Sequence, residues 1–283
     1  EDQGSNADLR GFPPLVLRSV GGLASIQRRT VHGAVEIGLG IGIPAPWTLF
    51  HQRFTSAWLR PSRRRPSRGR KVGAFKPVAT GCISHWEGLV SRDSEFLACC
   101  ANSDLRLTTI NPVAYVTAAA PIVSAAEERR PIDFKKIVSA YVEICQNCDI
   151  VIVEGIGGIR VPLTKEFDVR DLAVEFGLPV VIVSRPQLGT INHTLLTVDS
   201  IRAVHLEIAG VVINGCNSLQ STIAEETAGQ VISQYAKVPI LADVPLDETA
   251  SVEELKLGEV IVPSLADVDW TNLAKRNCPK KCG

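Results

Sequence analysis

The sequence lacks several features that would place it in a familiar class of protein. It contains no methionine among its 283 residues, and it opens on Glu1. No apolar run approaches the roughly 18 residues that a membrane-spanning helix requires. The first residues also lack the basic and then apolar pattern of a secretory signal. We therefore expect a cytoplasmic protein with no membrane partner, and the absent methionine indicates a missing or altered beginning.

Neither sign of charge prevails in the composition. Thirty basic and thirty acidic residues give a net charge of zero, and 45% of the residues are hydrophobic. This composition excludes a disordered chain and does not indicate a polyanionic partner. Residues 60–71 are nevertheless strongly basic, and no acidic residue occurs between Ile37 and Trp86. Because aromatic residues are not interleaved with these basic ones, the pattern favours a solvated arm over a nucleic-acid surface.

The eight cysteines do not form a disulfide framework. Most of them lie inside apolar stretches, which in a chain of this length indicates reduced thiols. Cys145 and Cys148 have the spacing of a zinc or redox motif, but no second pair of this spacing follows them. Cys278 and Cys282 are equally isolated, so neither pair predicts a metal site.

The chain divides into two unlike parts near residue 70. From residue 71 onward, short apolar runs alternate with amphipathic stretches, which is typical of a parallel sheet with crossover helices. Strands are expected at 71–75, 150–153, 180–183, 208–213 and 240–241, and helices at 133–145, 169–176, 191–204 and 221–235. Glycine and proline interrupt residues 1–70 before any period is established. We expect residues 71–283 to form one α/β domain with a mostly parallel sheet flanked by helices in three layers, and residues 1–70 to be an irregular segment, non-native or disordered.

The first motif whose side chains suit binding or catalysis begins at Lys76, directly after the expected strand 71–75. Pro77, Thr80 and Gly81 belong to the same motif. Binding sites of open α/β sheets lie at the carboxyl ends of the strands. A lysine at that edge can bind anionic oxygens. The alternative, a surface lysine before a turn-forming proline, accounts equally well for the motif taken alone.

The second motif is an apolar strand that runs into Glu154. The glycines Gly155, Gly157 and Gly158 follow it. A carboxylate at the end of a buried strand suits a magnesium ion that bridges nucleotide phosphates. Glycines let the backbone approach a ligand closely. A tight turn with an ordinary surface acid is the weaker explanation, because a fully apolar strand precedes the carboxylate.

The third motif comprises Gly189, Thr190, Ile191 and Asn192, at the head of an expected helix. Free backbone amides at a helix start bind anions such as a carboxylate. A plain N-cap by Thr190 or Asn192 explains the motif better when it is taken alone. Asn214, just past the strand 208–213, is another polar residue at the same predicted edge.

In their order and spacing these motifs resemble the dethiobiotin synthetase family, whose fold is of the P-loop NTPase type. The resemblance covers roughly residues 71–262. Each motif is weak alone, but the ordered set is specific. The other matching positions, all in the family's order, are Asp93, Asn111-Pro112, Val161-Pro162-Leu163, Gly210 to Asn214, and Asp243-Val244-Pro245.

The resemblance implies an ATP-dependent cyclo-ligase of biotin synthesis with Mg²⁺ and ATP as cofactors. Such an enzyme carboxylates 7,8-diaminopelargonate with CO₂ and closes the ureido ring with release of ADP and phosphate. By position, Lys76 and Thr80 would be catalytic and would contact the substrate. Asp93 and Glu154 would hold the metal ion.

The remaining roles carried over from the family concern the nucleotide and a partner subunit. The expected nucleotide-binding residues are Glu154, Gly155, Gly157, Gly158, Asn214 and Pro245, the last two at the adenine. The residues expected to receive the far carboxylate of the substrate are Gly189, Thr190, Ile191 and Asn192. In the family this carboxylate binds across a dimer interface, so a homodimer is implied.

One family feature is missing. The family carries a Gly-x-x-x-x-Gly-Lys-Thr/Ser loop that cradles phosphates, and this sequence has no match to it. Residues 50–58 contain no glycine, and the glycine-rich run 38–42 lacks a lysine. We therefore expect little turnover. Two interpretations remain open: an enzyme with a defective or diverged beginning, through a reading-frame slip near residue 70, or a catalytically impaired dimeric binding or regulatory module.

Overall fold

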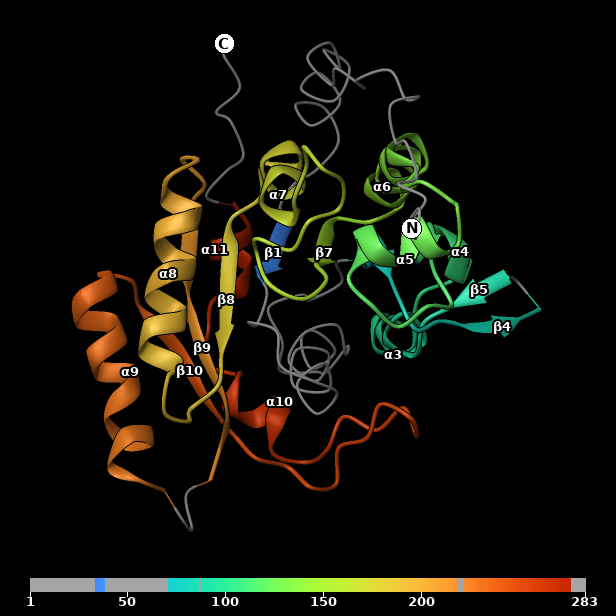
Figure 1. The fold of residues 1–283 in the computed structure, drawn as a ribbon. Helices are drawn as coiled ribbons and strands as arrows, with labels where there is room; N and C mark the ends of the chain where they lie inside the picture. The colour runs from blue at the N-terminus through green and yellow to red at the C-terminus, as the bar shows by residue number, and fades with distance from the viewer. Residues whose placement is uncertain (1–33, 39–70, 87, 218–220, 276–283) are drawn as a thin grey trace, which may run out of the picture.

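A computed structural model describes residues 34–38, 71–86, 88–217 and 221–275 of the chain (Figure 1). These residues build a six-stranded sheet with the order β10-β9-β8-β1-β7-β2. Every neighbouring pair of strands is parallel. The strands are β1 (Ala34–Gly38), β2 (Val72–Phe75), β7 (Ile150–Glu154), β8 (Val180–Ser184), β9 (Ile208–Cys216) and β10 (Ile240–Pro245).

Five of these strands confirm the apolar runs that the sequence predicts. β2, β7 and β8 are buried along their whole length. A parallel sheet covered by helices on both faces has no solvated side, so its strands are continuously hydrophobic rather than alternating. This burial explains why short apolar runs sufficed to locate them.

The strand β1 lies within residues 1–70, where the sequence predicts an irregular segment. It lies between β7 and β8 at the centre of the sheet (Figure 1). Its register pairs Ile37 with Glu154 and Gly38 with Ile182. The strand is five residues long and contains a glutamate, so it has no distinctive sequence pattern. Pairing on both sides, rather than intrinsic β propensity, defines it as a strand.

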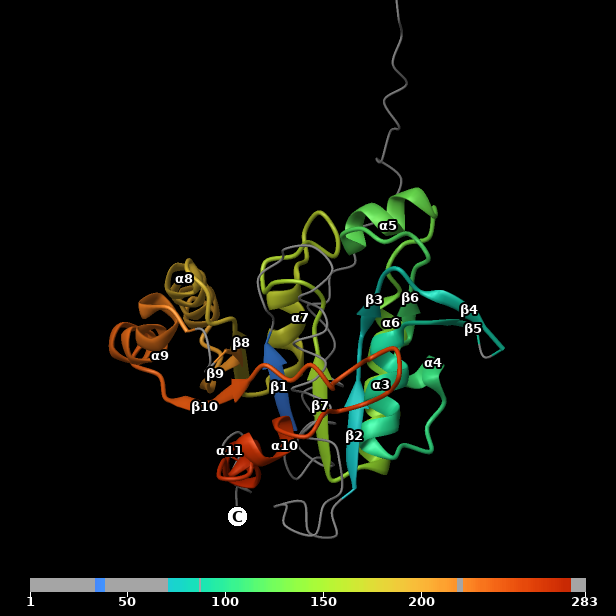
Figure 2. The same ribbon diagram turned by 90° about the horizontal axis from the view of Figure 1, so that it is seen from below.

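Helices cover both faces of the sheet and confirm the three-layer architecture (Figure 2). One face is covered by α6 (Phe134–Asn147), α7 (Val169–Phe176), α8 (Thr190–Arg202) and α9 (Ile223–Ala236), which match the four expected helices. The other face is covered by α3 (Arg92–Ala101), α10 (Ile261–Ser264) and α11 (Trp270–Lys275). The helices α3, α10 and α11 were not expected, because in none of them do apolar residues recur at helical spacing over a long stretch.

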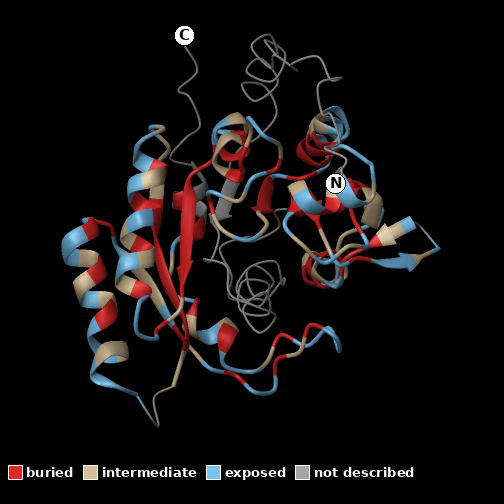
Figure 3. Cartoon of the chain, in the orientation of Figure 1, coloured by how far each residue is buried: buried red, intermediate tan, exposed pale blue. Residues whose placement is uncertain are grey.

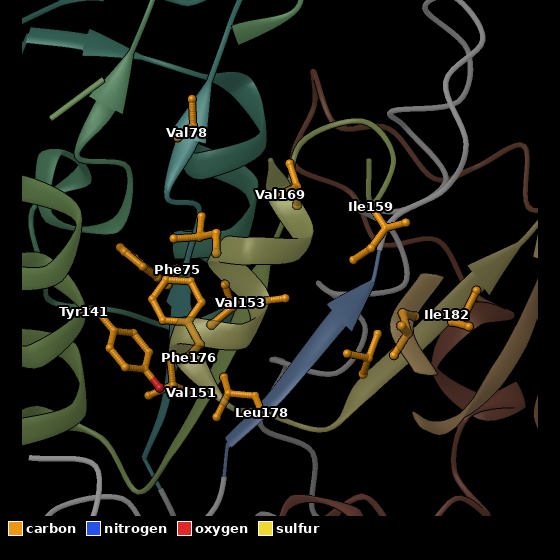
Figure 4. Close-up of a cluster of buried hydrophobic side chains, with 14 of the residues drawn as sticks. Phe75, Val78, Tyr141, Val151, Val153, Ile159, Val169, Phe176, Leu178 and Ile182 are labelled. Carbon is orange, nitrogen blue, oxygen red and sulfur yellow. The ribbon is translucent and has the colours of Figure 1, made fainter. Parts of the chain in front are cut away.

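The core forms two clusters, one on each face of the sheet. Figure 3 shows the buried strands of the sheet in red. Alternate residues of each strand point to opposite faces, so Val151 and Val153 belong to one cluster and Ile152 to the other. Phe75 contacts Tyr141 and Phe176, with ring centroids 5.7 and 5.9 Å away (Figure 4). This packing fixes the end of β2, directly before Lys76.

Two small strand pairs extend the fold beyond the end of β2. β3 (Val78–Ala79) pairs in parallel with β6 (Val113–Ala114), and β4 (Ile83–His85) pairs with β5 (Gly88–Val90) in a hairpin. The short helices α4 (Leu107–Ile110) and α5 (Pro121–Glu127) lie on either side of β6 in the chain. Elements of two to seven residues leave no periodic signal, so sequence reasoning missed them.

Two further findings concern the class of protein. None of the helices in the described ranges is long and apolar enough to cross a bilayer. The cysteines of these ranges are thiols rather than disulfides, as expected, and Cys145 and Cys148 are both buried. Cys278 and Cys282 lie outside the described residues.

Candidate active site

The order of the strands has a switch point at β1. β2 and β7 lie on one side of β1, and β8 to β10 lie on the other. The chain therefore crosses from one side of β1 to the other between β7 and β8. Such a switch point leaves a crevice beyond the carboxyl ends of the strands, where ligands of open α/β sheets bind.

Lys76 lies at one side of this edge, and its ammonium group meets three acceptors. Nζ donates to Glu154 Oε1 at 2.7 Å and to the Gly155 carbonyl oxygen at 2.8 Å. It also lies 3.4 Å from Asp93 Oδ2. Lys76 and Glu154 are only 4% and 3% exposed. The structure thus brings together three residues that lie far apart in the sequence.

Local structure accounts for the position of each group. The register of β2 and β7 pairs Phe75 with Val153, so Lys76 and Glu154 follow side by side. Asp93 lies in the first turn of α3, whose N-cap is the buried Ser91. The Ser91 hydroxyl oxygen accepts a hydrogen bond from the Ser94 amide at 3.1 Å. A carboxylate is favourable in a first turn, because the positive end of the helix dipole lies there.

The two carboxylates keep the buried lysine charged. Burial acts to lower the pKa of Lys76, but the negative charges of Glu154 and Asp93 outweigh it, and the net shift of the pKa is upward. A buried ammonium without partners would instead lose its proton. One positive and two negative charges leave this cluster with a net charge of −1, which favours a further cation.

The backbone of Lys76 is held by residues 110 and 111. Its amide donates to the Ile110 carbonyl at 2.8 Å. The Asn111 side chain donates from Nδ2 to the Lys76 carbonyl at 2.8 Å and to the Val113 carbonyl at 3.1 Å. Sequence reasoning named Asn111 only as a family match. The only signal for this contact in the sequence is the Asn-Pro pair before a short strand.

The glycine run after β7 shapes the backbone beside Glu154. Gly157 has a φ of +66°, and a Cβ atom there would lie 2.8 Å from Val161 Cγ2. Glycine is required at this position, because side chains disfavour both this conformation and this approach. Gly155 contributes its carbonyl to Lys76, whereas Gly158 accepts at its carbonyl from the Val161 amide.

Thr80 follows β3 and is half-buried. Gly81 comes next, with a φ of +70°. The Cys82 amide then donates to the Tyr115 carbonyl at 2.8 Å. The β3–β6 pair therefore continues the scaffold of Lys76 and carries Thr80 at its end.

The motif at the head of α8 lies on the other side of β1. Gly189 is the N-cap residue with a φ of +94°, and no side chain caps the helix there. Thr190 is buried, whereas Asn192 is exposed and Ile191 is half-buried. Three strand spacings, about 14 Å, separate β8 from β2 in the sheet. The structure therefore does not bring this motif next to Lys76 within one chain.

The last two strands bring together the residues expected at the adenine. Asn214 is buried near the end of β9, and Pro245 ends β10. The register pairs Asn214 with Val244 and Pro245 with Cys216. The two expected residues thus lie on neighbouring strands at the same edge.

A set of hydrogen bonds to the Asp247 carboxylate, here called the Asp247 clasp, holds the loop that follows β10. The Asp247 carboxylate accepts from the Thr249 amide at 3.0 Å, from the Thr249 hydroxyl at 2.6 Å and from the Val260 amide at 3.0 Å. Burial acts to raise the pKa of Asp247, but these donors outweigh it and lower the pKa. Gly258 packs on this carboxylate, and a Cβ atom there would lie 2.2 Å from Asp247 Oδ2.

The described residues fit part of a magnesium–nucleotide site. Mg²⁺ is bound by one or two carboxylates together with phosphate oxygens, and the cluster of Asp93 and Glu154 has that chemistry and a net negative charge. The residues after β1, where a phosphate loop would follow a central strand, lie outside the described residues. The sequence contains no Gly-Lys pair for such a loop.

Solved structures with a similar arrangement of elements share little sequence with this chain. A complex of the cell division proteins MinC and MinD from Aquifex aeolicus has a TM-score of 0.48 and 15% identity, covering 83% of this chain and 93% of that one. The cell division ATPase MinD from Pyrococcus furiosus has a TM-score of 0.45 and 16% identity, covering 86% and 96%. No functional conclusion follows from either.

Sequence comparisons are more specific. A family model described as an AAA domain matches residues 54–254. An ATP-dependent dethiobiotin synthetase from Thermodesulfovibrio yellowstonii is 35% identical over 215 residues, which cover 74% of this chain and 88% of that protein. Another from Aromatoleum aromaticum is 37% identical over 180 residues, covering 62% and 78%. With most of the relative's length matched at this identity, the chain belongs to the family of ATP-dependent dethiobiotin synthetases.

Proposed function

We propose that this chain forms dethiobiotin from 7,8-diaminopelargonate and CO₂, with conversion of ATP to ADP and phosphate. The observation that carries the proposal is the buried Lys76, held by Glu154 and Gly155 beside Asp93. A charged lysine in a dry site at the carboxyl edge of a parallel sheet suits a reaction that develops negative charge on oxygen. Membership of the dethiobiotin synthetase family supports the same reaction.

The proposed role of Lys76 is electrostatic. One substrate amine attacks the carbon of CO₂, an electron pair of one C=O bond moves to oxygen, and the amine proton passes to solvent, which leaves an anionic carbamate. Lys76 stabilises that anion, and Thr80 at the end of β3 contributes a hydroxyl. The ammonium donates to Glu154 and to the Gly155 carbonyl, and it forms an ion pair with Asp93 at 3.4 Å. The contact with Asp93 is the longest, so a carbamate oxygen would replace it most readily.

The carboxylates have a second proposed role. When bound, ATP supplies the phosphoryl group that activates the carbamate for attack by the second amine, which closes the ring and releases phosphate. Asp93 and Glu154 are the residues that would hold Mg²⁺, and Gly155 to Gly158 would line the nucleotide. Asn214 and Pro245 would contact the adenine. Positioning and charge compensation are the main tasks of a protein in phosphoryl transfer.

A second copy of the chain completes the proposed site. Gly189, Thr190, Ile191 and Asn192 would receive the far carboxylate of a substrate whose amines lie at Lys76 in the partner subunit. The open helix start supports this role, since its amides can bind an anion. Leu188 and Leu196 are 84% and 60% exposed on the same segment. Such apolar side chains suit a protein interface.

Calorimetric titration and product formation together test the proposal. We expect the chain to bind 7,8-diaminopelargonate in bicarbonate buffer but to bind ATP weakly, because a Gly-Lys loop for the phosphates is missing. Dethiobiotin formation is then slow, yet dependent on ATP and CO₂. Rapid turnover would contradict the expected weakness of nucleotide binding. Failure to bind either ligand would instead support the alternative, a dimeric binding or regulatory module without catalysis.

A further inference from the structure

Asn111 is buried beside the proposed catalytic lysine, at a break in hydrogen bonding between two chain segments. The strands β3 and β6 run parallel here, and the pairing is Val78 with Val113 and Ala79 with Ala114. Backbone bonds join Lys76 N–H to the Ile110 carbonyl, Val113 N–H to the Pro77 carbonyl, and Tyr115 N–H to the Ala79 carbonyl.

Lys76 precedes this pairing, and its amide bond to Ile110 has the opposite phase to the bonds at Pro77 and Ala79. A strand residue whose amide donates to residue 110 has its carbonyl placed for the amide of residue 112. Residue 112 is proline, which has no N–H group. The Asn111 Nδ2 atom lies 2.8 Å from the Lys76 carbonyl oxygen and takes the place of that donor.

The burial of Asn111 by itself lowers the stability of the fold. Asn111 is 2% exposed, and its Oδ1 atom is buried with no hydrogen-bond partner in the described part of the chain. Buried polar atoms without partners are uncommon and destabilising. An apolar residue at position 111 followed by a residue with an amide would satisfy the Lys76 carbonyl without burying that oxygen. The Asn-Pro pair therefore provides a contact that ordinary strand pairing would provide more simply.

We propose that Asn111 is a positioning residue for Lys76. This inference rests on the proposed function, because it assigns Asn111 a role through the lysine. The side chain of Asn111 bridges the carbonyls of Lys76 and Val113, and so it fixes the backbone at the point where the chain leaves β2. With that backbone fixed, the Lys76 ammonium stays on Glu154 and Gly155 and does not turn toward solvent.

A rescue experiment tests the role of the missing donor. The variant Asn111→Ala removes the side-chain donor, whereas the double variant Asn111→Ala/Pro112→Ala restores a backbone N–H at position 112. Two measurements are made on each variant: the affinity for 7,8-diaminopelargonate in bicarbonate buffer, and acylation of Lys76 by an amine-reactive ester, read by mass spectrometry. Neither measurement requires turnover.

We expect Asn111→Ala to weaken substrate binding about tenfold or more, since small displacements of a positioned group cost a factor of about 10² in favourable cases. Lys76 acylation should rise in this variant. The double variant should regain most of the affinity and of the protection. If Asn111→Ala does not fold, recovery of a folded chain with a protected Lys76 in the double variant supports the proposal, and its absence overturns it.

Two controls separate the possible failures. Ser233→Ala removes a comparable hydrogen bond, from the Ser233 hydroxyl to the Val238 carbonyl at 3.0 Å, beside β10 at the far edge of the sheet. Equal affinity and equal Lys76 acylation in Asn111→Ala and Ser233→Ala would overturn the positioning role, as would a loss that the double variant does not reverse. Lys76→Met tests the proposed function itself. Unchanged substrate binding in Lys76→Met would refute the role of the lysine. The acylation data would still show whether Asn111 keeps Lys76 in place.

Discussion

The residues proposed to be functional are held differently on the two sides of the sheet. On the β2–β7 side, the Lys76 ammonium is buried, and acceptors on Glu154 and Gly155, at the end of β7, lie within 2.8 Å of it. On the β8–β10 side, the α8 head has no side-chain cap and Leu188 is 84% exposed. A charged group in a dry site must be fixed by its own chain, because an unpaired buried charge is very unfavourable. Residues that bind the ends of a ligand can stay open until the ligand or a partner covers them.

The replacement Lys76→Met should have the largest effect. It removes the positive charge but keeps most of the apolar side chain, so the carbamate loses its stabilising partner. We expect dethiobiotin formation to fall by about 10²–10³-fold relative to the unmodified chain, as when one charge-stabilising donor is lost. Lys256→Met is the matched control, because Lys256 is exposed and pairs with the exposed Glu254. Similar rates for the two variants would show that the β2–β7 side is not the catalytic one.

The replacement Glu154→Gln should have the next largest effect, on stability. It leaves the buried Lys76 with Asp93 as its remaining carboxylate. Breaking a buried ion pair costs about 3 kcal/mol or more, so we expect a fall of that size in the free energy of unfolding. Chemical denaturation measures it, and Glu166→Gln at an exposed position is the control. Coincident denaturation midpoints would contradict the fixed geometry inferred for this side.

The replacement Asp247→Asn tests the fixed part of the opposite side. Its amide group would face the Val260 N–H, which now donates to the carboxylate. We expect a loss of about 1–3 kcal/mol in the free energy of unfolding at pH 7. Because the pKa of Asp247 is lowered from 3.8 in the folded chain, its charged form stabilises the fold above the unfolded pKa. That contribution disappears as pH falls through the lower folded value.

Thermal unfolding at several pH values therefore distinguishes the charged from the protonated form of the Asp247 carboxyl. The difference between Asp247→Asn and the unmodified chain should be constant at neutral pH and should shrink below pH 3.8. Asp267→Asn, at an exposed position, serves as the control. A difference that grows on acidification would contradict the assigned sign.

The replacement Leu188→Lys should have the smallest effect on the fold. The side chain is largely exposed, so the free energy of unfolding of the isolated chain should change by less than about 0.5 kcal/mol. If the α8 head lies at a dimer interface, the same change should shift a dimer toward monomer in sedimentation experiments. Tyr235→Lys is a control on α9, where Tyr235 is 68% exposed. Equal sedimentation of both variants would remove this support for a shared site.

Much of the fold could be predicted from the sequence because the relevant signals are local. A fully apolar run such as Ile150 to Val153 identifies a covered strand, and the carboxylate that follows it must lie at the carboxyl edge. The expected helices α6, α7, α8 and α9 have an apolar face that recurs every three or four residues. The pairing of Lys76 with Glu154 was not predicted, since neither residue predicts its neighbour.

Other features could not be predicted, because they depend on contacts between distant segments. The strand β1 has no pattern of its own and is defined by β7 and β8 on either side. The Asp247 clasp joins residues 13 positions apart. The proline at position 112 is visible in the sequence, but its consequence for the Lys76 carbonyl appears only when residues 76 and 111 are neighbours.

The sequence alone therefore determined the class of fold, the edge at which the proposed site lies and the chemical groups available there, because burial and strand polarity follow from local residue order. The tertiary structure alone decided which strand occupies the centre of the sheet and which groups surround Lys76. It also showed that the α8 head lies three strands away from that lysine. These facts depend on strand order and register, which are set by packing between segments that the sequence keeps far apart.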